Sequence, residues 1–213
     1  MHILFITSTL PRYKNDHQAP FVLEQAVAWK KTFSNDDVTI LAPDHRKAQR
    51  EEVNNNVFIR RFSYFWPRAW QTLTYPAITP NIQKRPWLIL LIPAYILFQV
   101  LAVRKSCKNN PLDILYAHWI IPQGITAYLA KRFFKIPYIL QNHSRDLEIL
   151  MKIPLIGKIF ARAILRNAQA IFCVNNYQKI RILQLFDKND QDLPNDKIKV
   201  LPMGLNISKK HFH

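Results

Sequence analysis

The sequence predicts an α/β fold, in which a doubly wound, mostly parallel, Rossmann-like sheet is flanked by helices. Short segments rich in Ile, Leu, Val and Phe recur along the 213 residues, and longer amphipathic patterns separate most of them. Strands that are apolar throughout indicate burial on both faces, as in a parallel sheet covered by helices. Right-handed crossovers between such strands give the doubly wound arrangement.

The N-terminal part begins with an expected strand over residues 2–7, where β-branched and aromatic side chains follow one another. After a polar loop, Pro20 is expected to open a helix, because a proline in the first turn loses no hydrogen bond. One apolar stripe recurs along that helix at Val22, Ala26, Trp29 and Phe33. Strands are then expected over residues 37–42 and 57–62.

An aromatic and proline-rich stretch over residues 63–80 shows no clear period and is expected to be an irregular loop. Residues 87–103 follow as a long apolar segment in which Gln99 is the one polar side chain. Three interpretations are open: a helix packed on the sheet, a membrane span, or a docked helix with one face in a membrane surface. We favour packing, because the strand alternation requires a helix here. Basic residues flank both ends of the segment, so they give no signal for its orientation in a membrane.

The C-terminal part continues the same alternation. Strands are expected over residues 113–117, 137–141, 170–174 and 197–201, and helices over residues 122–134, 154–168 and 177–186. The second of these helices has an expected buried stripe at Ile156, Ile159, Phe160, Ala163 and Ile164. Its opposite face has an expected basic ridge at Lys158, Arg162 and Arg166.

The amino-acid composition and the missing motifs narrow the classes of function that the sequence allows. Lys and Arg total 30 against 14 acidic residues, and the net charge of +16 favours anionic partners without choosing among them. Only three glycines are present, and neither a dinucleotide-binding GxGxxG nor a GxxxxGK[ST] loop occurs. A GxSxG hydrolase motif is also missing, and no helix-turn-helix, RNA-recognition or zinc-finger pattern supports nucleic-acid binding.

The cysteines and the N-terminal residues indicate the cellular compartment in which the protein is expected. Cys107 and Cys173 have no CxxC partner, which is typical of a reducing compartment. Residues 1–8 lack the basic start and the length of a secretory signal. We therefore expect a cytoplasmic protein, with a peripheral place at the inner membrane face as one option.

Histidines follow two strands that should be neighbours in the sheet. His118 ends the fourth expected strand, and His143 follows the fifth. Because ligands bind beyond the carboxyl ends of parallel strands, both side chains should face one cleft. A purely structural role for these histidines stays open, whereas a zinc site lacks a third ligand at suitable spacing.

At these residues the sequence resembles the N-terminal domain of glycosyltransferase family 4, whose members are retaining GT-B enzymes. Residues 113–124, with the sequence DILYAHWIIPQG, are similar to the family stretch DxIHAHWxxPxG. Residues 136–146 are similar to IPYVxTxHGxD, and Pro202, Gly204 and Phe212 resemble PNGVDxxxF. The opening strand with Ser8 and Pro11, and residues 20–26 and 38–43, also match the family's beginning, so the resemblance covers the whole chain.

The resemblance implies that this domain binds the acceptor, that a C-terminal domain binds a nucleotide sugar, and that no metal or other cofactor is required. The acceptor would be a glycan or a lipid-linked glycan, as in lipopolysaccharide or exopolysaccharide synthesis at an anionic membrane face. His143 would contact the donor hexose, and Asp146 would orient its loop. Further substrate-binding residues would be His118, Trp119, Gly124, Ser144 and Arg145.

The sequence also departs from the family. Ala19 and Pro20 stand where the first loop usually has glycine, and Ser144 replaces the glycine after the loop histidine. Met203 and Asn206 replace the usual Asn and Asp, and no two glutamates are spaced as in the donor domain's Glu-x7-Glu motif.

These departures lead to an expectation about which domains the chain contains. We expect a Rossmann-like domain over residues 1–202 and the start of an inter-domain linker over 203–213, without the donor-binding domain. The chain alone would then be inactive unless a separate polypeptide supplies that domain. The alternative is a non-catalytic remnant that binds or scaffolds at a membrane surface.

Overall fold

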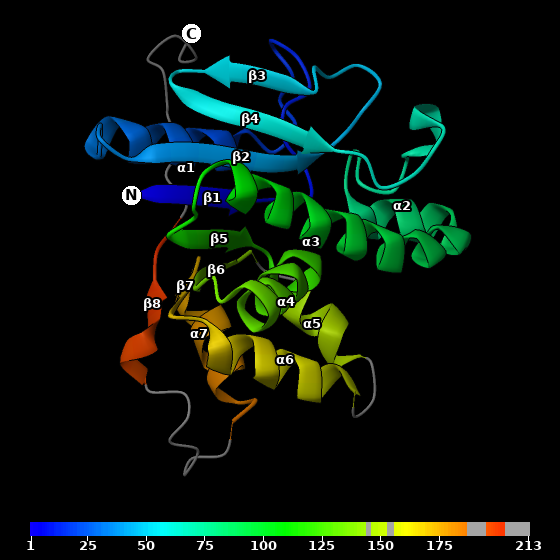
Figure 1. Ribbon diagram of the computed structural model, residues 1–213. Coiled ribbons are helices and arrows are strands. Elements are labelled where there is room, and N and C mark those ends of the chain that lie inside the picture. The colour runs from blue at the N-terminus through cyan, green and yellow to red at the C-terminus, as the bar shows by residue number, and fades with distance from the viewer. Residues whose placement is uncertain (144–145, 153–155, 187–194, 203–213) are drawn as a thin grey trace, which may run out of the picture.

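The computed structural model describes residues 1–143, 146–152, 156–186 and 195–202 (Figure 1). Within these residues one eight-stranded sheet runs in the order β3-β4-β2-β1-β5-β6-β7-β8. Only β3 is antiparallel to its neighbour, so the predicted mostly parallel, doubly wound sheet is confirmed. The strands are β1 (His2–Ile6), β2 (Asp37–Pro43), β3 (Glu51–Asn54), β4 (Val57–Phe62), β5 (Ile114–His118), β6 (Tyr138–Asn142), β7 (Ala170–Cys173) and β8 (Ile198–Val200).

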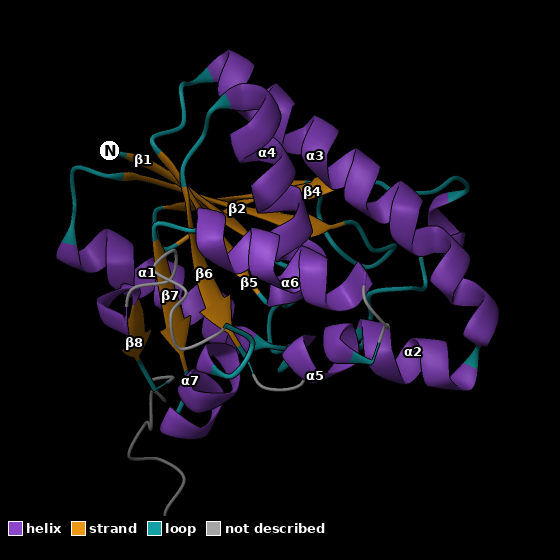
Figure 2. Ribbon diagram, turned by 90° about the horizontal axis from the view of Figure 1, so that it is seen from below, coloured by secondary structure: helices purple, strands orange, loops and turns teal. Residues whose placement is uncertain are grey.

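Helices cover both faces of the sheet. The α-helices are α1 (Pro20–Thr32), α2 (Ile78–Lys84), α3 (Leu91–Asn109), α4 (Ile125–Phe134), α5 (Asp146–Met151), α6 (Ile156–Asn167) and α7 (Asn176–Leu183). Short helical turns are η1 (Arg68–Trp70), η2 (Pro86–Leu90), η3 (Ile120–Gly124) and η4 (Asn195–Lys197). Figures 1 and 2 show α3, α4 and α6 together on one face of the sheet and α1 on the other.

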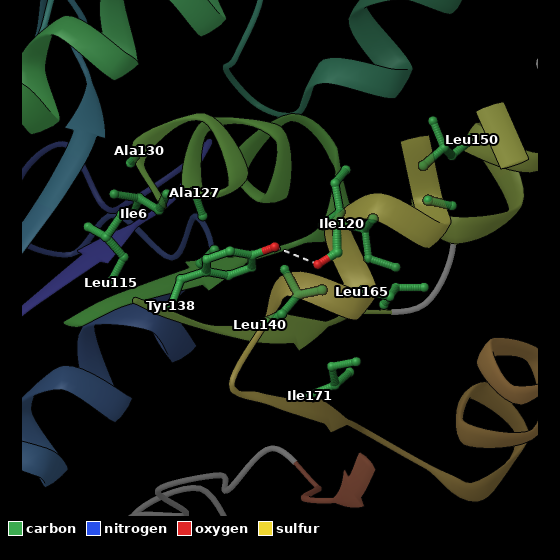
Figure 3. Packing of buried hydrophobic residues seen from close by; sticks show 14 of the residues in the cluster. Ile6, Leu115, Ile120, Ala127, Ala130, Tyr138, Leu140, Leu150, Leu165 and Ile171 are labelled. Atoms are coloured by element: carbon green, nitrogen blue, oxygen red, sulfur yellow. Dashed lines mark hydrogen bonds between the residues drawn. The ribbon is translucent and has the colours of Figure 1, made fainter. Parts of the chain in front are cut away.

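The core has two parts because successive side chains of each strand point to opposite faces. In β1, Leu4 and Ile6 pack into the cluster under α3, α4 and α6, whereas Ile3 and Phe5 pack into the cluster under α1. Figure 3 shows part of the larger cluster, where the hydroxyl of Tyr138 donates a hydrogen bond to the backbone carbonyl of Ile164. This bond ties β6 to α6 inside the apolar core.

The structure adds elements that the sequence analysis missed. β3 is a polar edge strand without the apolar run on which strand prediction relies. It pairs with β4 through a two-residue loop in which Asn55 and Asn56 both have positive φ, at 49° and 63°. Such a loop matches the twist of a hairpin, and asparagine tolerates this conformation. The stretch expected as irregular also contains η1 and the start of α2, and α5 follows the His143 loop.

The long apolar segment is packed on the sheet, as we favoured. Over its length η2 is followed by α3, which contacts β2, β4 and α4. Tyr95, Gln99 and Val103 on its inner face are fully buried. Among the described residues, Pro86–Lys108 is the one helical stretch long and apolar enough to cross a membrane, and 33% of its most apolar window is buried in the protein.

The expected buried stripe of α6 is partly wrong. Ile159 and Phe160 are 63% and 44% exposed, whereas Ala161, Ile164 and Leu165 are buried. The helix therefore faces the sheet with a stripe shifted by one or two positions, a difference that periodicity alone resolves poorly in a helix with many apolar residues. Ile156 belonged to the expected stripe, but its side chain lies outside the described residues.

Two of the three residues in the expected basic ridge on α6 contact the chain after α7. The Nε of Arg162 donates to the carbonyl of Leu185 at 2.7 Å, and the guanidinium groups of Arg162 and Arg166 lie 5.9 and 5.6 Å from the ring of Phe186. These two arginines thus hold α6 against the segment after α7. Lys158 remains exposed.

Candidate functional site

The two predicted histidines meet at the carboxyl edge of the sheet. β5 and β6 are parallel neighbours with His118 opposite Gln141, and the backbone N–H of Trp119 donates to the carbonyl of Gln141 at 2.8 Å. This register places Nδ1 of His118 2.9 Å from Nε2 of His143, within hydrogen-bonding distance. The prediction that both histidines end neighbouring strands is confirmed.

Burial keeps the pair uncharged near neutral pH. His118 has no exposed surface, and desolvation, followed by the charge on nearby His143, holds its pKa well below the ordinary value. Burial also lowers the pKa of His143 from 6.5 to about 4. Because both rings are neutral, one nitrogen of the shared contact carries the proton and the other accepts it.

Aromatic rings enclose the pair. Phe5 in β1 stacks on His118 with ring centroids 5.9 Å apart, and Tyr116 lies 5.2 Å from it. Phe21, the second residue of α1, and Trp119 lie 5.0 and 4.8 Å from the ring of His143. The site thus has an apolar wall, which accounts for the desolvation of both imidazoles.

A polar relay lies beside this wall. The hydroxyl of Tyr116 donates to Oε1 of Gln141 at 2.7 Å and accepts from Nε2 of Gln25 at 2.8 Å. Gln25 belongs to α1, so the relay joins α1, β5 and β6 next to the histidines. Sequence reasoning missed these residues, because each lies inside an element and not after a strand.

Two residues in the segment after β5 have unusual local environments, Trp119 in its backbone conformation and Gly124 in its packing. Trp119 has φ of 75° and ψ of 143°, a backbone conformation that is uncommon for a residue with a side chain and that clusters at functional sites. Gly124 is buried, and a Cβ built there would lie 3.0 Å from Cγ2 of Ile164 and 3.2 Å from Cδ1 of Leu140. The structure thus shows a packing reason for Gly124, and its predicted contact with substrate stays a prediction.

The loop after β6 contains three further predicted residues. Ser144 and Arg145 lie outside the described residues, as does the expected linker from residue 203 onward. Asp146 begins α5, but its side chain also lies outside what the structure describes. The roles predicted for these residues therefore stay predictions.

A group of basic side chains that sequence reasoning missed lies at the same edge of the sheet, where Arg12 pairs with Asp16 at 2.6 Å and Arg61 pairs with Glu52 at 3.1 Å. The ring of Tyr75 lies 5.4 Å from the guanidinium of Arg12 and 5.0 Å from the ring of His45, and its hydroxyl accepts from Arg61 at 3.0 Å. Burial, followed by the charges of Arg12, Arg46 and other nearby cations, lowers the pKa of His45. Arg12 and His45 follow β1 and β2, so the signal that identified His118 could have found them.

Among the residues that the structure describes, no group of three His, Cys, Asp or Glu side chains is placed to hold a metal ion. Cys107 and Cys173 form no disulfide in the described part of the chain, and Cys173 is buried.

The mostly parallel sheet with a site at its carboxyl edge forms a Rossmann-like domain. The sequence profile of Glycosyltransferase Family 4 matches residues 21–209. The chain therefore belongs to glycosyltransferase family 4.

One curated relative is an uncharacterised glycosyltransferase of Methanocaldococcus jannaschii, 28% identical over 127 residues. The match covers 60% of this chain and 32% of the relative, so the chain spans well under two thirds of that protein.

Solved structures share the fold at low identity. Sucrose-phosphate synthase from Thermosynechococcus elongatus matches with a TM-score of 0.59 and 13% identity, over 97% of this chain and 91% of that one. An E. coli trehalose-6-phosphate structure bound with UDP-2-fluoro glucose matches with a TM-score of 0.60 and 10% identity, over 96% and 49%. UDP-GlcNAc 2-epimerase from Neisseria meningitidis, bound to UDP-GlcNAc, matches with a TM-score of 0.52 and 12% identity, over 94% and 46%. At these identities the likeness shows the fold alone.

Proposed function

We propose that this chain is the acceptor-side domain of a retaining glycosyltransferase, which transfers a sugar from a nucleotide sugar to a glycan or lipid-linked acceptor. The observation that carries the proposal is the neutral His118–His143 pair at the carboxyl edge of a family 4 domain. Two structures with the same fold were solved with UDP-sugars bound, which supports a nucleotide sugar as the co-substrate. In this proposal no metal ion takes part.

The two histidines have different roles in the proposal. His143 is the partly exposed member, and it contacts the donor sugar through the ring nitrogen that does not face His118. His118 is fully buried behind it and acts as a positioning residue. When His118 donates from Nδ1, His143 must carry its proton on Nδ1 and can donate it to a sugar hydroxyl. A buried partner thus fixes the tautomer that the substrate meets.

Basic side chains near Tyr75 lie where the phosphate of such a substrate could bind. Nucleotide sugars and lipid-linked acceptors both contain phosphates, and the carboxyl edge that holds His143 also holds Arg12, which is paired with Asp16 at 2.6 Å. His45 lies beside Tyr75 and is uncharged near neutral pH, because its pKa is lowered, whereas the adjacent Arg46 is exposed. We propose that Arg46 attracts the phosphate of a substrate bound at that edge.

The donor side of the reaction belongs to a second domain in this proposal. The chain spans 32% of the length of its curated relative, and the second domain lies on the same or on a separate polypeptide. The purified chain should release no nucleotide from a panel of nucleotide sugars with a membrane lipid extract as acceptor. Adding a family 4 donor domain should restore turnover. Turnover by the chain alone would contradict this division of roles.

The histidines are tested in the complete enzyme. His143→Ala should lower kcat by about 100-fold, because it removes a contact made to the reacting sugar. His2→Ala is the matched control, since His2 lies at the opposite edge of the sheet, where its Nδ1 faces the carbonyl of Pro111. Full activity of His143→Ala would contradict the role given to His143. Absence of turnover even with a donor domain present would instead favour the second candidate, a non-catalytic domain that binds or scaffolds at a membrane.

A further inference from the structure

We propose that the outer face of η2 and α3 docks on the surface of an anionic lipid bilayer. This η2–α3 face consists of the exposed apolar side chains Trp87, Ile89, Leu90, Leu97, Phe98 and Leu101. Their exposed fractions run from 44% for Phe98 to 77% for Leu90. Together they form a row of large apolar side chains along one continuous helical segment, unlike the single exposed apolar residues that are normal on soluble proteins.

The helix cannot turn this face inward, because polar bonds fix its opposite side. The hydroxyl of Tyr95 and the amide of Gln99 both donate to the carbonyl of Thr7, at 3.2 and 3.4 Å. Thr126 of α4 donates to Oε1 of Gln99 at 2.8 Å. Leu90, Leu97 and Leu101 then recur at helical spacing on the side away from these bonds. A membrane-spanning arrangement would break the bonds, whereas surface docking keeps them.

The charge around this face matches an anionic surface. From residue 53 to residue 112 the chain has no Asp or Glu but has eight Lys and Arg residues. Five of these cations are exposed at the two ends of the η2–α3 face: Lys84, Arg85, Arg104, Lys105 and Lys108. Each cation close to an anionic leaflet adds to binding, and the apolar row supplies the insertion.

A groove beside α3 offers a place for a lipid headgroup. It has a volume of about 640 Å³, and its lining includes Phe98, Leu101, Lys105 and Arg50. Glu51 also lines it and pairs with Arg60 at 2.9 Å. Apolar and cationic side chains thus lie side by side, as an acyl chain and its phosphate require.

The exposed tryptophan of the η2–α3 face favours a bilayer over a second copy of the chain. Trp87 is 57% exposed. Tryptophan is enriched at membrane–water interfaces, where the ring is apolar and the N–H stays hydrated. A second copy would place the two sets of cations of this face against each other, which is unfavourable.

Docking through this face also orients the proposed site. Thr7, which accepts from Tyr95, directly follows β1, so the η2 end of the segment lies toward the carboxyl edge where His143 lies. The bilayer would then be next to the edge that receives a lipid-linked acceptor. This orientation rests on the proposed function, whereas the docking does not.

The test is co-sedimentation of the purified protein with vesicles of phosphatidylcholine alone or mixed with phosphatidylglycerol. We expect binding to the mixed vesicles, and a loss of affinity of about tenfold or more in Leu97→Gln/Leu101→Gln. The matched control is Ile159→Gln/Phe160→Gln on α6, whose side chains are similarly exposed, and it should bind as the parent does. Arg104→Gln/Lys105→Gln should reduce the preference for phosphatidylglycerol. Thermal unfolding of each variant checks that it folds.

Equal binding by the parent and Leu97→Gln/Leu101→Gln, or equal losses in both double variants, would overturn the proposal. So would a dimer in sedimentation velocity that Leu97→Gln/Leu101→Gln abolishes while vesicle binding is absent, because the face would then belong to a second copy. Quenching of Trp87 by brominated lipid, lost in Trp87→Phe, gives an independent measure of insertion. The assay contains no nucleotide sugar, so its failure is distinct from a failure of glycosyl transfer.

Discussion

His118 and His143 are both neutral, because burial makes it costly to protonate either imidazole. His118 is sealed behind His143, Phe5 and Tyr116, and no water-exposed surface is left to stabilise an imidazolium. The contact of 2.9 Å therefore requires complementary tautomers, in which one ring donates and the other accepts. This order at the residue scale suits a site that must present one defined hydrogen-bonding atom to a sugar.

The same burial predicts a pH dependence of stability. The pKa of His143 in the folded protein is lowered to about 4, below the value of about 6.5 in the unfolded chain. As the pH falls from about 6.5 to 4, the unfolded state takes up the proton first, so folded-state stability is lost in that window and is unaffected above it. The loss should be on the order of 2 to 3 kcal/mol, measured by urea unfolding at a series of pH values.

The control for this pH dependence is His118→Gln/His143→Gln, which removes both rings and should make the curve shallower between about pH 6.5 and 4, while the lowered pKa of His45 still contributes. An equally steep curve in that variant would assign the pH dependence to other groups.

At the scale of the element, α3 has a small polar network on its buried face and large apolar side chains on its exposed face. Gln99, the one polar residue that stands out in the apolar sequence, lies on the buried face, where it bonds Thr7, Tyr95 and Thr126. Gln123 of η3 adds a donor to the hydroxyl of Tyr95 at 2.9 Å. Because buried polar groups must be paired, this network holds α3 in one rotation and leaves an apolar face in solvent.

Breaking this network should destabilise the fold. Gln99→Leu keeps the volume but removes the acceptor of Thr126 and two donated bonds, so we expect a loss of about 1 to 3 kcal/mol in chemical denaturation. The neighbouring Phe98→Leu changes an exposed side chain and should stay within about 0.5 kcal/mol of the parent. A neutral Gln99→Leu would mean that the buried network contributes nothing to stability.

At the scale of the whole molecule, the central strand β1 joins two cores. Its side chains alternate between the cluster under α1 and the cluster under α3, α4 and α6, and Ile3 and Leu4 are both fully buried. A sheet covered on both sides couples its two layers through one set of backbone hydrogen bonds. We therefore expect the described domain to unfold as one unit.

This coupling is tested with two adjacent substitutions in β1. Ile3→Ala and Leu4→Ala should each cost about 2 to 5 kcal/mol, although they empty opposite cores. Far-ultraviolet circular dichroism and tryptophan fluorescence should report the same transition for both variants. A small effect for one substitution, or separate transitions for the two probes, would show that the two layers unfold independently.

Much of the fold was determined by the sequence itself. The strand over residues 57–62 and the helix opened by Pro20 are local signals that tertiary packing did not need to correct. The positions of His118 and His143 after neighbouring strands also predicted their meeting, because parallel strands bring their carboxyl ends to one edge. The relay through Gln25 and Tyr116 could not be predicted, since it joins residues 91 positions apart.

The tertiary structure alone decided which side of each apolar helix is covered. In α6 it buries Ala161 and Leu165 and exposes Ile159 and Phe160, and in α3 it buries Gln99 and exposes Leu97. Sequence periodicity cannot settle this where apolar residues surround the helix, because any rotation then buries a similar apolar area. What selects one rotation is the pairing of a few polar groups with distant partners, and those partners come together only in the folded chain.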